Sequence, residues 1–300
     1  MILSDYGVEM QFEQKYNKIK SLLKNELTEI EKNMCEFYCG IQSLQENLIS
    51  VVTAPSKKIR PVLNLLYLKM YGAEITKKQI IIQSAVELIH NASLIHDDVI
   101  DNSDTRRNVK TLNYSFGNNL AVVMGDYLLT IAIQKLLRLD SKEIFEIFND
   151  SLMCLCKGEL NQYIWKFKVP PIENYIEKCK NKTAKLFVAG LKSSAICANL
   201  NVESAEKFAE LFGIAFQIRD DLSDIIKNES DKPSKSDITN GIYNAPVIYS
   251  ENIKNSDVGI AKTKELLDNY LRELNLLLET APNNKFKQEL IDLLGILGEL

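Results

Sequence analysis

The stretch that decides the fold is ELIHNASLIHDDVIDNSDTRR, which runs from Glu87 to Arg107. Its apolar residues recur three and four positions apart, which is the spacing of one face of an α-helix. The stretch contains the acidic motif DDxxD at residues 97–101. A second DDxxD motif, at residues 220–224, ends the similar apolar stretch FGIAFQIRDDLSDI, residues 212–225. The sequence therefore predicts two buried helices that each lead into a carboxylate cluster.

The rest of the chain continues this helical pattern. Apolar residues three and four apart also mark NLLYLKMYG, NLAVVMGDYLLTIAIQKLL and KLFVAGLKSSAICANL. Only 12 of the 300 residues are Gly and 7 are Pro, so the residues that favour turns are scarce. Breaks are expected near Pro55 and at residues 168–172, 228–241 and 281–284, and none of these resembles an interdomain linker. We predict an all-α fold, a large single-domain helix bundle over residues 1–300.

Composition excludes several classes of function. The net charge of −4 argues against a dedicated nucleic-acid binder. With only two histidines, His90 and His96, a site built from several His ligands is excluded. The ExxH pattern at residues 87–90 is typical of di-iron bundles, but such bundles need a second ExxH that this sequence lacks.

Cellular context follows from the N-terminus and the cysteines. The first residues, MILSDYGVEMQFEQKYNK, lack a basic start and a secretory apolar stretch, and no run of 18 apolar residues occurs. We therefore expect a cytoplasmic protein without a transmembrane segment. Its six cysteines are expected to be reduced thiols that pack as small buried hydrophobes.

The two acidic motifs indicate metal binding. In a helix, Asp97 and Asp101 share one face, and so do Asp220 and Asp224. Ionised carboxylates next to buried helices are costly unless a cation compensates them. Oxygen ligands with few nitrogen donors suit Mg²⁺ better than Zn²⁺. The sequence thus favours Mg²⁺ holding an anionic ligand, with two solvated acidic helix ends as the alternative.

Basic residues lie near the first motif. Arg106 and Arg107 either neutralise neighbouring aspartates or donate to a phosphate group. Lys57 and Arg60 precede Pro61 near a helix start, where an anion is favoured. His90 lies two helical turns before Asp97 and therefore on the same face. His96 is interpreted as structural.

These residues resemble the two aspartate-rich regions of the trans-polyprenyl diphosphate synthases. Further matching strings occur in the order of that family, from about Lys57 to Pro246: SKKIRPVL, GDYLL, GELNQ, NKTAKLF and KPSKSDITNG. The resemblance implies a helix bundle of the isoprenoid synthase type around a deep central cavity. It also implies a homodimer.

Roles for individual residues come from this resemblance. It implies that three Mg²⁺ ions join both motifs to an allylic diphosphate, held by Asp97, Asp101 and Asp220. The supporting carboxylates are Asp98, Asp221 and Asp224. The residues implied on the allylic side are Arg106, Lys182, Thr183 and Gln217. The residues implied for the diphosphate of isopentenyl diphosphate are Lys57, Arg60, His90 and Arg107.

The implied reaction is chain elongation. Metal ions and cationic side chains stabilise the charge that develops when the allylic C–O bond breaks. The double bond of isopentenyl diphosphate attacks the allylic cation, and the departing diphosphate takes the proton. Ala92 and Ser93, near the first motif, are small, which predicts a product longer than fifteen carbons and a shorter one for Ala92→Phe. Release of such a product is compatible with peripheral membrane contact.

The sequence departs from the family pattern at three places. Pro55 and Ser56 stand where two glycines are usual, and residues 108–110 read NVK where Gly-x-Pro is usual. Ile242 replaces the lysine of a usual Gly-Lys pair, which removes a cation from the allylic side. Lys227, Lys232 and Lys235 are nearby candidates to replace it.

Two other functions stay open. A class I terpene cyclase uses the same metal-triggered ionisation, but the complete second DDxxD motif favours a synthase. A non-catalytic subunit of a heteromeric synthase typically loses aspartates, whereas all six are present here.

Overall fold

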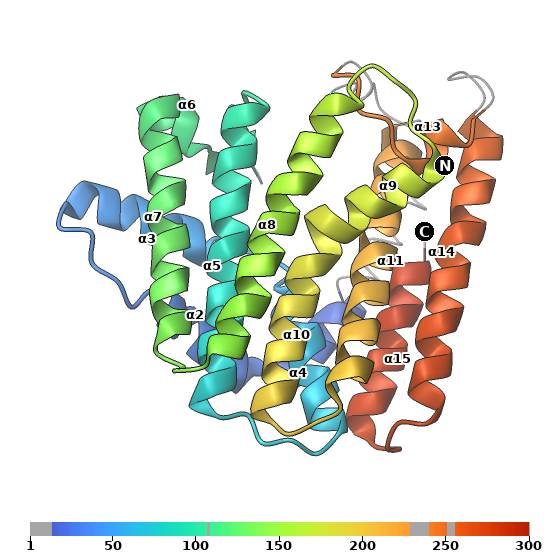
Figure 1. Ribbon diagram of the computed structural model, residues 1–300, viewed down its shortest axis with the longest axis horizontal. Helices are drawn as coiled ribbons and strands as arrows, with labels where there is room; N and C mark the ends of the chain where they lie inside the picture. The colour runs from blue at the N-terminus through green and yellow to red at the C-terminus, as the bar shows by residue number, and fades with distance from the viewer. Residues whose placement is uncertain (1–13, 107–108, 229–239, 251–255, 300) are drawn as a thin grey trace. The chain divides into compact units, whose positions relative to one another are not determined.

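The described part of the chain folds almost entirely into α-helices (Figure 1). The computed structural model describes residues 14–106, 109–228, 240–250 and 256–299. Its helices and strands are α2 (Lys24–Met34), α3 (Gln42–Thr53), α4 (Ile59–Met70), α5 (Lys77–Ile100), β1 (Thr105–Arg106), β2 (Val109–Lys110), α6 (Leu112–Phe116), α7 (Asn118–Leu137), α8 (Lys142–Ile164), α9 (Ile172–Cys179), the π-helix η1 (Lys180–Ala184), α10 (Lys185–Cys197), α11 (Val202–Asn228), α13 (Ala245–Ile248), α14 (Ser256–Glu279) and α15 (Lys285–Gly298). The predicted all-α class is confirmed.

Internal contacts divide the chain into two compact units, which are described separately. The α5 unit comprises Leu23–Leu65 and Glu74–Glu146. The α11 unit comprises the described residues up to Leu22, together with Leu66–Ala73 and those after Glu146. The first acidic motif belongs to the α5 unit and the second to the α11 unit. The single-domain organisation over residues 1–300 stays a prediction.

The α5 unit is organised around its longest helix. α5 begins with a capping box, in which the Thr76 hydroxyl accepts from the Lys78 amide and the Gln79 side chain accepts from the Thr76 amide. The apolar residues along its core-facing side are buried, and the helix packs against α2, α3, α6 and α7. Ile100, at its C-terminal end, is exposed. These contacts confirm the helical stripe that the sequence predicts.

His96 holds α5 against α7. Its Nε2 lies 3.2 Å from Oδ1 of Asp126 on α7. The ring also lies directly against Gly125, where a Cβ atom would be 2.4 Å from Nε2. Gly125, in the string GDYLL, is therefore needed for this close approach, and the structural interpretation of His96 is supported.

In the α11 unit, α11 contacts α9, η1, α10, α13, α14 and α15. Phe187 of α10 and Phe212 and Phe216 of α11 form an aromatic cluster, with ring centroids 5.4 to 6.5 Å apart. Burial of one such side chain contributes roughly 1.5–3 kcal/mol. This packing anchors the helix that carries the second acidic motif.

Some sequence-based expectations are confirmed and others are wrong. Breaks fall as predicted near Pro55, between α8 and α9, and between α14 and α15. The chain after α5, however, forms a short antiparallel β-hairpin of β1 and β2, which helical periodicity does not predict. None of the six cysteines, all within the described residues, forms a disulfide. Only Cys179 is buried and Cys156 is exposed, so the expectation of buried hydrophobes holds for Cys179 and is wrong for the others.

One helix of the described residues, α7, is long and apolar enough to cross a membrane by length and composition alone. Of its most apolar window, 44% is buried inside the protein. Because the core helix of a soluble protein passes the same test, this finding is weak evidence for a membrane span.

Candidate active site

The first acidic motif lies at the C-terminal end of α5. Asp97 and Asp98 belong to the last turn, and Asp101 is the C-cap residue. The helix dipole places partial negative charge at this end, so ionised carboxylates are unfavourable here without a cation. Asp97 and Asp101, one turn apart, both keep solvent exposure. Their placement matches the arrangement that the sequence predicts for a metal site.

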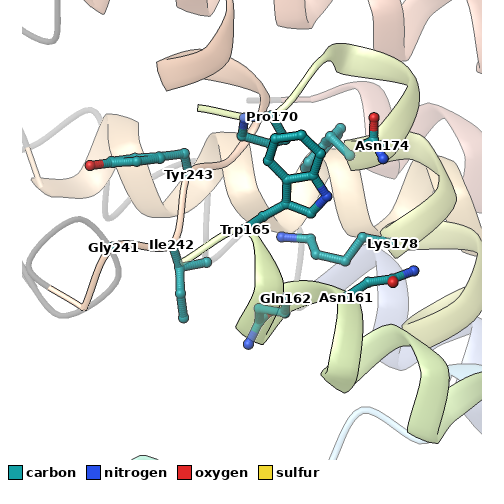
Figure 2. A pocket seen from close by; sticks show the side chains of 10 residues that line it. Asn161, Gln162, Trp165, Pro170, Asn174, Lys178, Gly241, Ile242 and Tyr243 are labelled. Atoms are coloured by element: carbon teal, nitrogen blue, oxygen red, sulfur yellow. The ribbon is translucent and has the colours of Figure 1, made fainter. Parts of the chain in front are cut away.

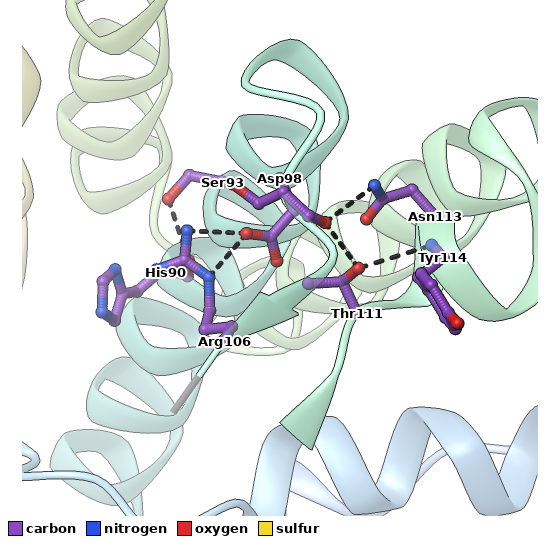
Figure 3. A network of polar contacts seen from close by, with 8 residues as sticks. His90, Ser93, Asp98, Arg106, Thr111, Asn113 and Tyr114 are labelled. Carbon is purple, nitrogen blue, oxygen red and sulfur yellow. Dashed lines mark hydrogen bonds and ion pairs between the residues drawn. The ribbon is translucent and has the colours of Figure 1, made fainter. Parts of the chain in front are cut away.

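Asp98 differs from these two residues because its side chain is buried at 6% exposure. Nε and Nη2 of Arg106 each lie 2.8 Å from Oδ1 of Asp98 (Figure 3). Arg106 is in β1, so this ion pair ties the hairpin to the end of α5. Arg106, which the resemblance places on the allylic diphosphate, thus has a protein carboxylate as its partner.

The loop after α5 is fixed by further hydrogen bonds (Figure 3). The backbone carbonyl of Ser103 accepts from the Thr111 hydroxyl at 2.7 Å and from the Asn113 side-chain amide at 3.0 Å. The Thr111 hydroxyl in turn caps α6 by accepting from the backbone amide of Tyr114. The hairpin that carries Arg106 is therefore fixed at two points, by the ion pair with Asp98 at the end of α5 and by the hydrogen bonds to Ser103 from the α6 side. Arg107 lies outside the described residues.

The basic segment before α4 divides its side chains between the interior and the solvent. Lys58 has a left-handed backbone, with φ of 53°, and its Nζ lies 3.7 Å from Oε2 of Glu87 in a largely buried ion pair. Arg60 is buried in the first turn of α4, whereas Lys57 is exposed. Of the two adjacent lysines, Lys57 is thus the accessible one, and its role as a ligand stays a prediction.

The Lys58–Glu87 pair also explains the ExxH pattern on α5. Glu87 faces a lysine, and His90, three positions later, is partly exposed two turns before Asp97. The backbone carbonyl of His90 accepts from the Ser93 hydroxyl at 2.8 Å (Figure 3). The predicted chain-length residue Ala92 is buried, while Ser93 is partly exposed.

The second acidic motif lies near the C-terminal end of α11. Asp221 is buried at 6% exposure and accepts from the Tyr175 hydroxyl at 2.7 Å and from Nε2 of Gln217 at 2.9 Å. Asp220 and Asp224, one turn apart, keep solvent exposure. The two motifs are therefore built alike: protein donors bind the middle carboxylate, and the outer two carboxylates stay accessible to solvent.

The segment with Lys182 and Thr183 is the π-helical turn η1, between α9 and α10. Single π-helical turns within α-helices often occur at functional sites. The Thr183 hydroxyl donates to Oε1 of Gln217 at 2.6 Å, so the amide nitrogen of Gln217 is left to face Asp221. The structure thus brings Thr183 and Gln217, both implied by the resemblance on the allylic side, into contact with each other and with the second motif.

Two glycines allow η1 to pack closely against its neighbours. A Cβ atom at Gly213 of α11 would lie 2.5 Å from Cα of Ala184. A Cβ atom at Gly158 of α8 would lie 3.1 Å from the backbone nitrogen of Lys182. The Lys182 ammonium forms an ion pair with Glu159, the residue after Gly158. The strings GELNQ and FGIAFQ therefore mark the packing of this turn.

Tyr175 and Cys179 are site residues that sequence reasoning misses. They lie one turn apart on α9, and both are buried. Burial first, and the Asp221 charge second, raise the pKa of Tyr175 well above its usual value and the pKa of the Cys179 thiol to about 12. Tyr175 therefore stays protonated and donates to Asp221 throughout the physiological pH range. Tyr175 and Cys179 are four positions apart, a spacing that occurs on every face of every helix, so the sequence does not identify them as site residues.

A pocket adjoins this network (Figure 2). It is an open hollow of about 410 Å³, a volume that includes solvent at its mouth. Its lining comes from the end of α8, from α9 and from the segment before α13. Tyr175 belongs both to its wall and to the hydrogen-bond network of Asp221. Ile242, which replaces the lysine expected from the resemblance, lies on the same wall. So does Lys178, which sequence reasoning does not single out.

The accessible carboxylates fit Mg²⁺. No group of three or more His, Cys, Asp or Glu side chains that could enclose a metal occurs among the described residues. Mg²⁺ usually keeps several waters and takes one or two carboxylates together with phosphate oxygens. The pairs Asp97 with Asp101 and Asp220 with Asp224 supply this kind of donor set.

Comparison with known proteins identifies relatives over most of the chain. Residues 41–275 match the family model described as polyprenyl synthetase. The chain is 32% identical over 240 residues to a prenyl transferase of Cyanophora paradoxa, covering 76% of this chain and 73% of the relative. It is 29% identical to the heptaprenyl diphosphate synthase component 2 of Geobacillus stearothermophilus, covering 95% of this chain and 99% of the relative.

Solved structures share the fold. The geranylgeranyl pyrophosphate synthetase of Pyrococcus horikoshii superposes with a TM-score of 0.83 at 26% identity, covering 97% of this chain and 99% of that one. A decaprenyl diphosphate synthase of Rhodobacter capsulatus gives a TM-score of 0.84 at 22% identity, covering 95% and 98%. The second likeness concerns the fold alone.

Proposed function

This chain belongs to the polyprenyl synthetase family and is a prenyl transferase, and we propose that it condenses an allylic diphosphate with isopentenyl diphosphate. In each cycle the allylic C–O bond breaks and a C–C bond forms to the incoming double bond. The newly added five-carbon unit loses one proton, and inorganic diphosphate is released. The product is an allylic diphosphate five carbons longer.

The observation that carries this proposal is the shared construction of the two acidic motifs. In each motif the middle carboxylate is buried and bound by protein donors, Arg106 in one case and Tyr175 with Gln217 in the other. The outer carboxylates remain accessible one turn apart. Because protein donors fix the middle carboxylate, the outer pair is preorganised for a metal–diphosphate complex.

Magnesium is the cofactor of this proposal. We infer three ions per site, with Asp97, Asp101 and Asp220 as the protein ligands. When bound, Mg²⁺ neutralises the diphosphate oxygens and so makes the diphosphate a better leaving group. The hydrogen bonds to Asp98 and Asp221 orient the helix ends that carry these ligands.

Basic and polar side chains complete the proposed substrate sites. On the allylic side, Gln217 is oriented by Thr183, and Lys182 is positioned by Glu159. For isopentenyl diphosphate we propose Lys57, Arg60, His90 and Arg107. The exposed Lys57 and the partly exposed His90 support this assignment, because both are accessible within the α5 unit.

The proton lost in the reaction is proposed to leave with the diphosphate. Near the second motif, Tyr175 and Cys179 have raised pKa values and hold their own protons at neutral pH, so neither serves as a base. Diphosphate oxygens are present at the moment when the C–C bond forms. Elongation also requires that water be kept from the allylic cation, which it would otherwise capture.

A product longer than fifteen carbons is proposed. Ala92 and Ser93 leave no large side chain on α5 in the turn before the motif. Relatives named decaprenyl-diphosphate synthase, from Dictyostelium discoideum, and octaprenyl diphosphate synthase, from Escherichia coli, support a long product. A relative of Methanocaldococcus jannaschii is named short chain isoprenyl diphosphate synthase, and the elongation experiment below resolves products shorter and longer than fifteen carbons.

We further propose a cytoplasmic homodimer, in line with the resemblance. The relative from Geobacillus stearothermophilus, which is named as one component of a synthase, favours a second candidate function. In that case the chain would be one subunit of a heteromeric synthase. Activity that appears only after a second polypeptide is added would select this alternative.

Elongation can be tested with the purified chain, Mg²⁺, isopentenyl diphosphate and allylic primers of ten, fifteen and twenty carbons. We expect stepwise addition of five-carbon units to products beyond fifteen carbons. Asp97→Asn and Asp220→Asn should each lower turnover by orders of magnitude while circular dichroism stays helical. Absence of elongation with every primer, or near wild-type turnover of either variant, would contradict the proposal.

A further inference from the structure

We propose that Lys178 binds the diphosphate group beside the second acidic motif and supplies the positive charge that Ile242 does not provide. The inference rests on the proposed function and specifies one residue of its diphosphate site. Lys178 lies on α9, four positions before Lys182.

The position of Lys178 carries the first part of the argument. Its side chain lines the same pocket as Ile242 and Trp165 and reaches toward the space between them (Figure 2). Nζ donates to Oδ1 of Asn244 at 3.1 Å and lies 5.2 Å from the ring centroid of Tyr175. The ammonium is therefore held at the pocket wall, over the ring whose hydroxyl binds Asp221.

The charge of Lys178 carries the second part. The lysines that follow it on η1 and α10 are paired with glutamates: Lys180 and Lys185 with Glu210, Lys182 with Glu159, and Lys192 with Glu206. Among the described residues, no carboxylate lies within 4.0 Å of the Lys178 ammonium. Its positive charge is therefore not balanced by a neighbouring carboxylate of the described chain, as the others are.

The chemistry of the pocket matches an anion. Its described lining contains no carboxylate, and Asn161, Gln162 and Asn174 add side-chain amides to the same wall. Nε2 of Gln162 donates to Oε2 of Glu159 at 3.4 Å, so Asn161 and Asn174 are the amides considered for an anion. Charge-assisted donors grouped in a concave site suit a ligand with several anionic oxygens. A diphosphate group is such a ligand, and the neighbouring acidic motif is the proposed site of its Mg²⁺.

The backbone next to Ile242 is fixed, so this residue has a defined place on the wall. Gly241 has φ of 75°, and a Cβ atom there would lie 2.6 Å from the backbone nitrogen of Phe167. The same nitrogen donates to the Gly241 carbonyl at 2.9 Å. A lysine introduced at position 242 would therefore start from the wall of the pocket that Lys178 lines.

The test uses Lys178→Met, which keeps side-chain length but removes the charge. We expect the affinity for inorganic diphosphate with Mg²⁺, measured by calorimetry, to fall about tenfold. The KM for the allylic diphosphate should rise by a similar factor, with an unchanged KM for isopentenyl diphosphate. The matched control is Lys157→Met, on an exposed part of α8. In Lys178→Met combined with Ile242→Lys, both values should recover.

The outcomes separate this inference from the proposed function. If only the KM for the allylic diphosphate changes, Lys178 binds the diphosphate group of the substrate. If only the affinity for inorganic diphosphate changes, Lys178 binds the released product. Wild-type values in Lys178→Met, or an equal loss for isopentenyl diphosphate, would overturn the inference while elongation stands. If the wild type elongates no primer, calorimetry with inorganic diphosphate still decides the role of Lys178. If neither value recovers in the double variant, the idea that Lys178 takes the place of a lysine at position 242 is refuted.

Discussion

The hydroxyl of Tyr175 donates a hydrogen bond of 2.7 Å to Oδ2 of Asp221, a residue 46 positions further along the chain, and both side chains are buried. Gln217 donates to the other oxygen of the same carboxylate. Asp221 thus has both oxygens bound by protein, and its side chain is buried, whereas Asp220 and Asp224 keep solvent exposure. We interpret it as a positioning carboxylate for the end of α11.

Tyr175→Phe tests this interpretation because it removes the hydroxyl and keeps the ring. Because the substitution leaves one oxygen of the buried Asp221 carboxylate without its donor, the free energy of unfolding should fall by about 1–3 kcal/mol. Half-maximal turnover should then require more Mg²⁺. Urea denaturation and a Mg²⁺ titration measure the two effects, with Tyr163→Phe, on an exposed side chain, as the control. An unchanged Mg²⁺ requirement would argue against a positioning role.

Within the first motif, Asp98 and Asp101 should respond differently to the same substitution. Asp98→Asn removes the charge that pairs with Arg106, so the hairpin after α5 should loosen and the melting temperature should fall. Asp101→Asn should leave the melting temperature nearly unchanged but lower turnover by orders of magnitude. Thermal unfolding and steady-state kinetics of both variants check this. Identical behaviour of the two variants would show that the division between middle and outer carboxylates is wrong.

Gly213→Ala should destabilise the packing of η1. The added Cβ would lie 2.5 Å from Cα of Ala184, so the backbone of η1 or α11 must move. Overpacking of this kind costs about 1–3 kcal/mol. Gly295→Ala is the matched control, because its Cβ would meet no atom within 4 Å and alanine favours the helix. Chemical denaturation should give Gly213→Ala a lower free energy of unfolding than the wild type, and Gly295→Ala an equal or higher one.

Stability at high pH should depend on Cys179. Burial first, and the charge of Asp221 next, raise the pKa of this thiol from 9.0 to about 12. The folded protein therefore keeps a proton that the unfolded chain releases. This contribution is complete below pH 9 and is lost as the pH rises toward 12.

We accordingly expect the free energy of unfolding to fall between pH 9 and 12, with a smaller slope for Cys179→Ala. Denaturant titrations at several pH values measure that slope. Cys156→Ala, at an exposed position, should keep the wild-type slope. A wild-type slope in Cys179→Ala would contradict the assignment.

Product length should be sensitive to position 93. Ala92 is only 2% exposed, so Ala92→Phe perturbs packing as well as any tunnel, whereas Ser93 is partly exposed and tolerates a larger side chain better. We expect Ser93→Phe to shorten the product with little change in melting temperature. Chromatography of the products, compared with those of Ser93→Ala, makes the measurement. An unchanged product spectrum would remove this residue from the proposed tunnel.

Local sequence pattern predicts a large part of this structure. The apolar spacing in α5 and α11 predicts both helices, and the DDxxD spacing places the outer aspartates on one face. The same geometry turns the middle aspartate about 100° away from the first. Whether that second face meets solvent or protein depends on distant segments, so the roles of Arg106 and Tyr175 do not follow from the pattern.

The sequence by itself therefore determines the helices, their acidic ends and the family resemblance, because these depend on residues within a few turns of one another. Only the tertiary structure decides that Lys58 pairs with Glu87, that Thr183 orients Gln217, and that Lys178 shares a pocket with Ile242. These contacts join residues about 30 or more positions apart. Helical periodicity specifies which side chains share a face, but only packing specifies what covers that face.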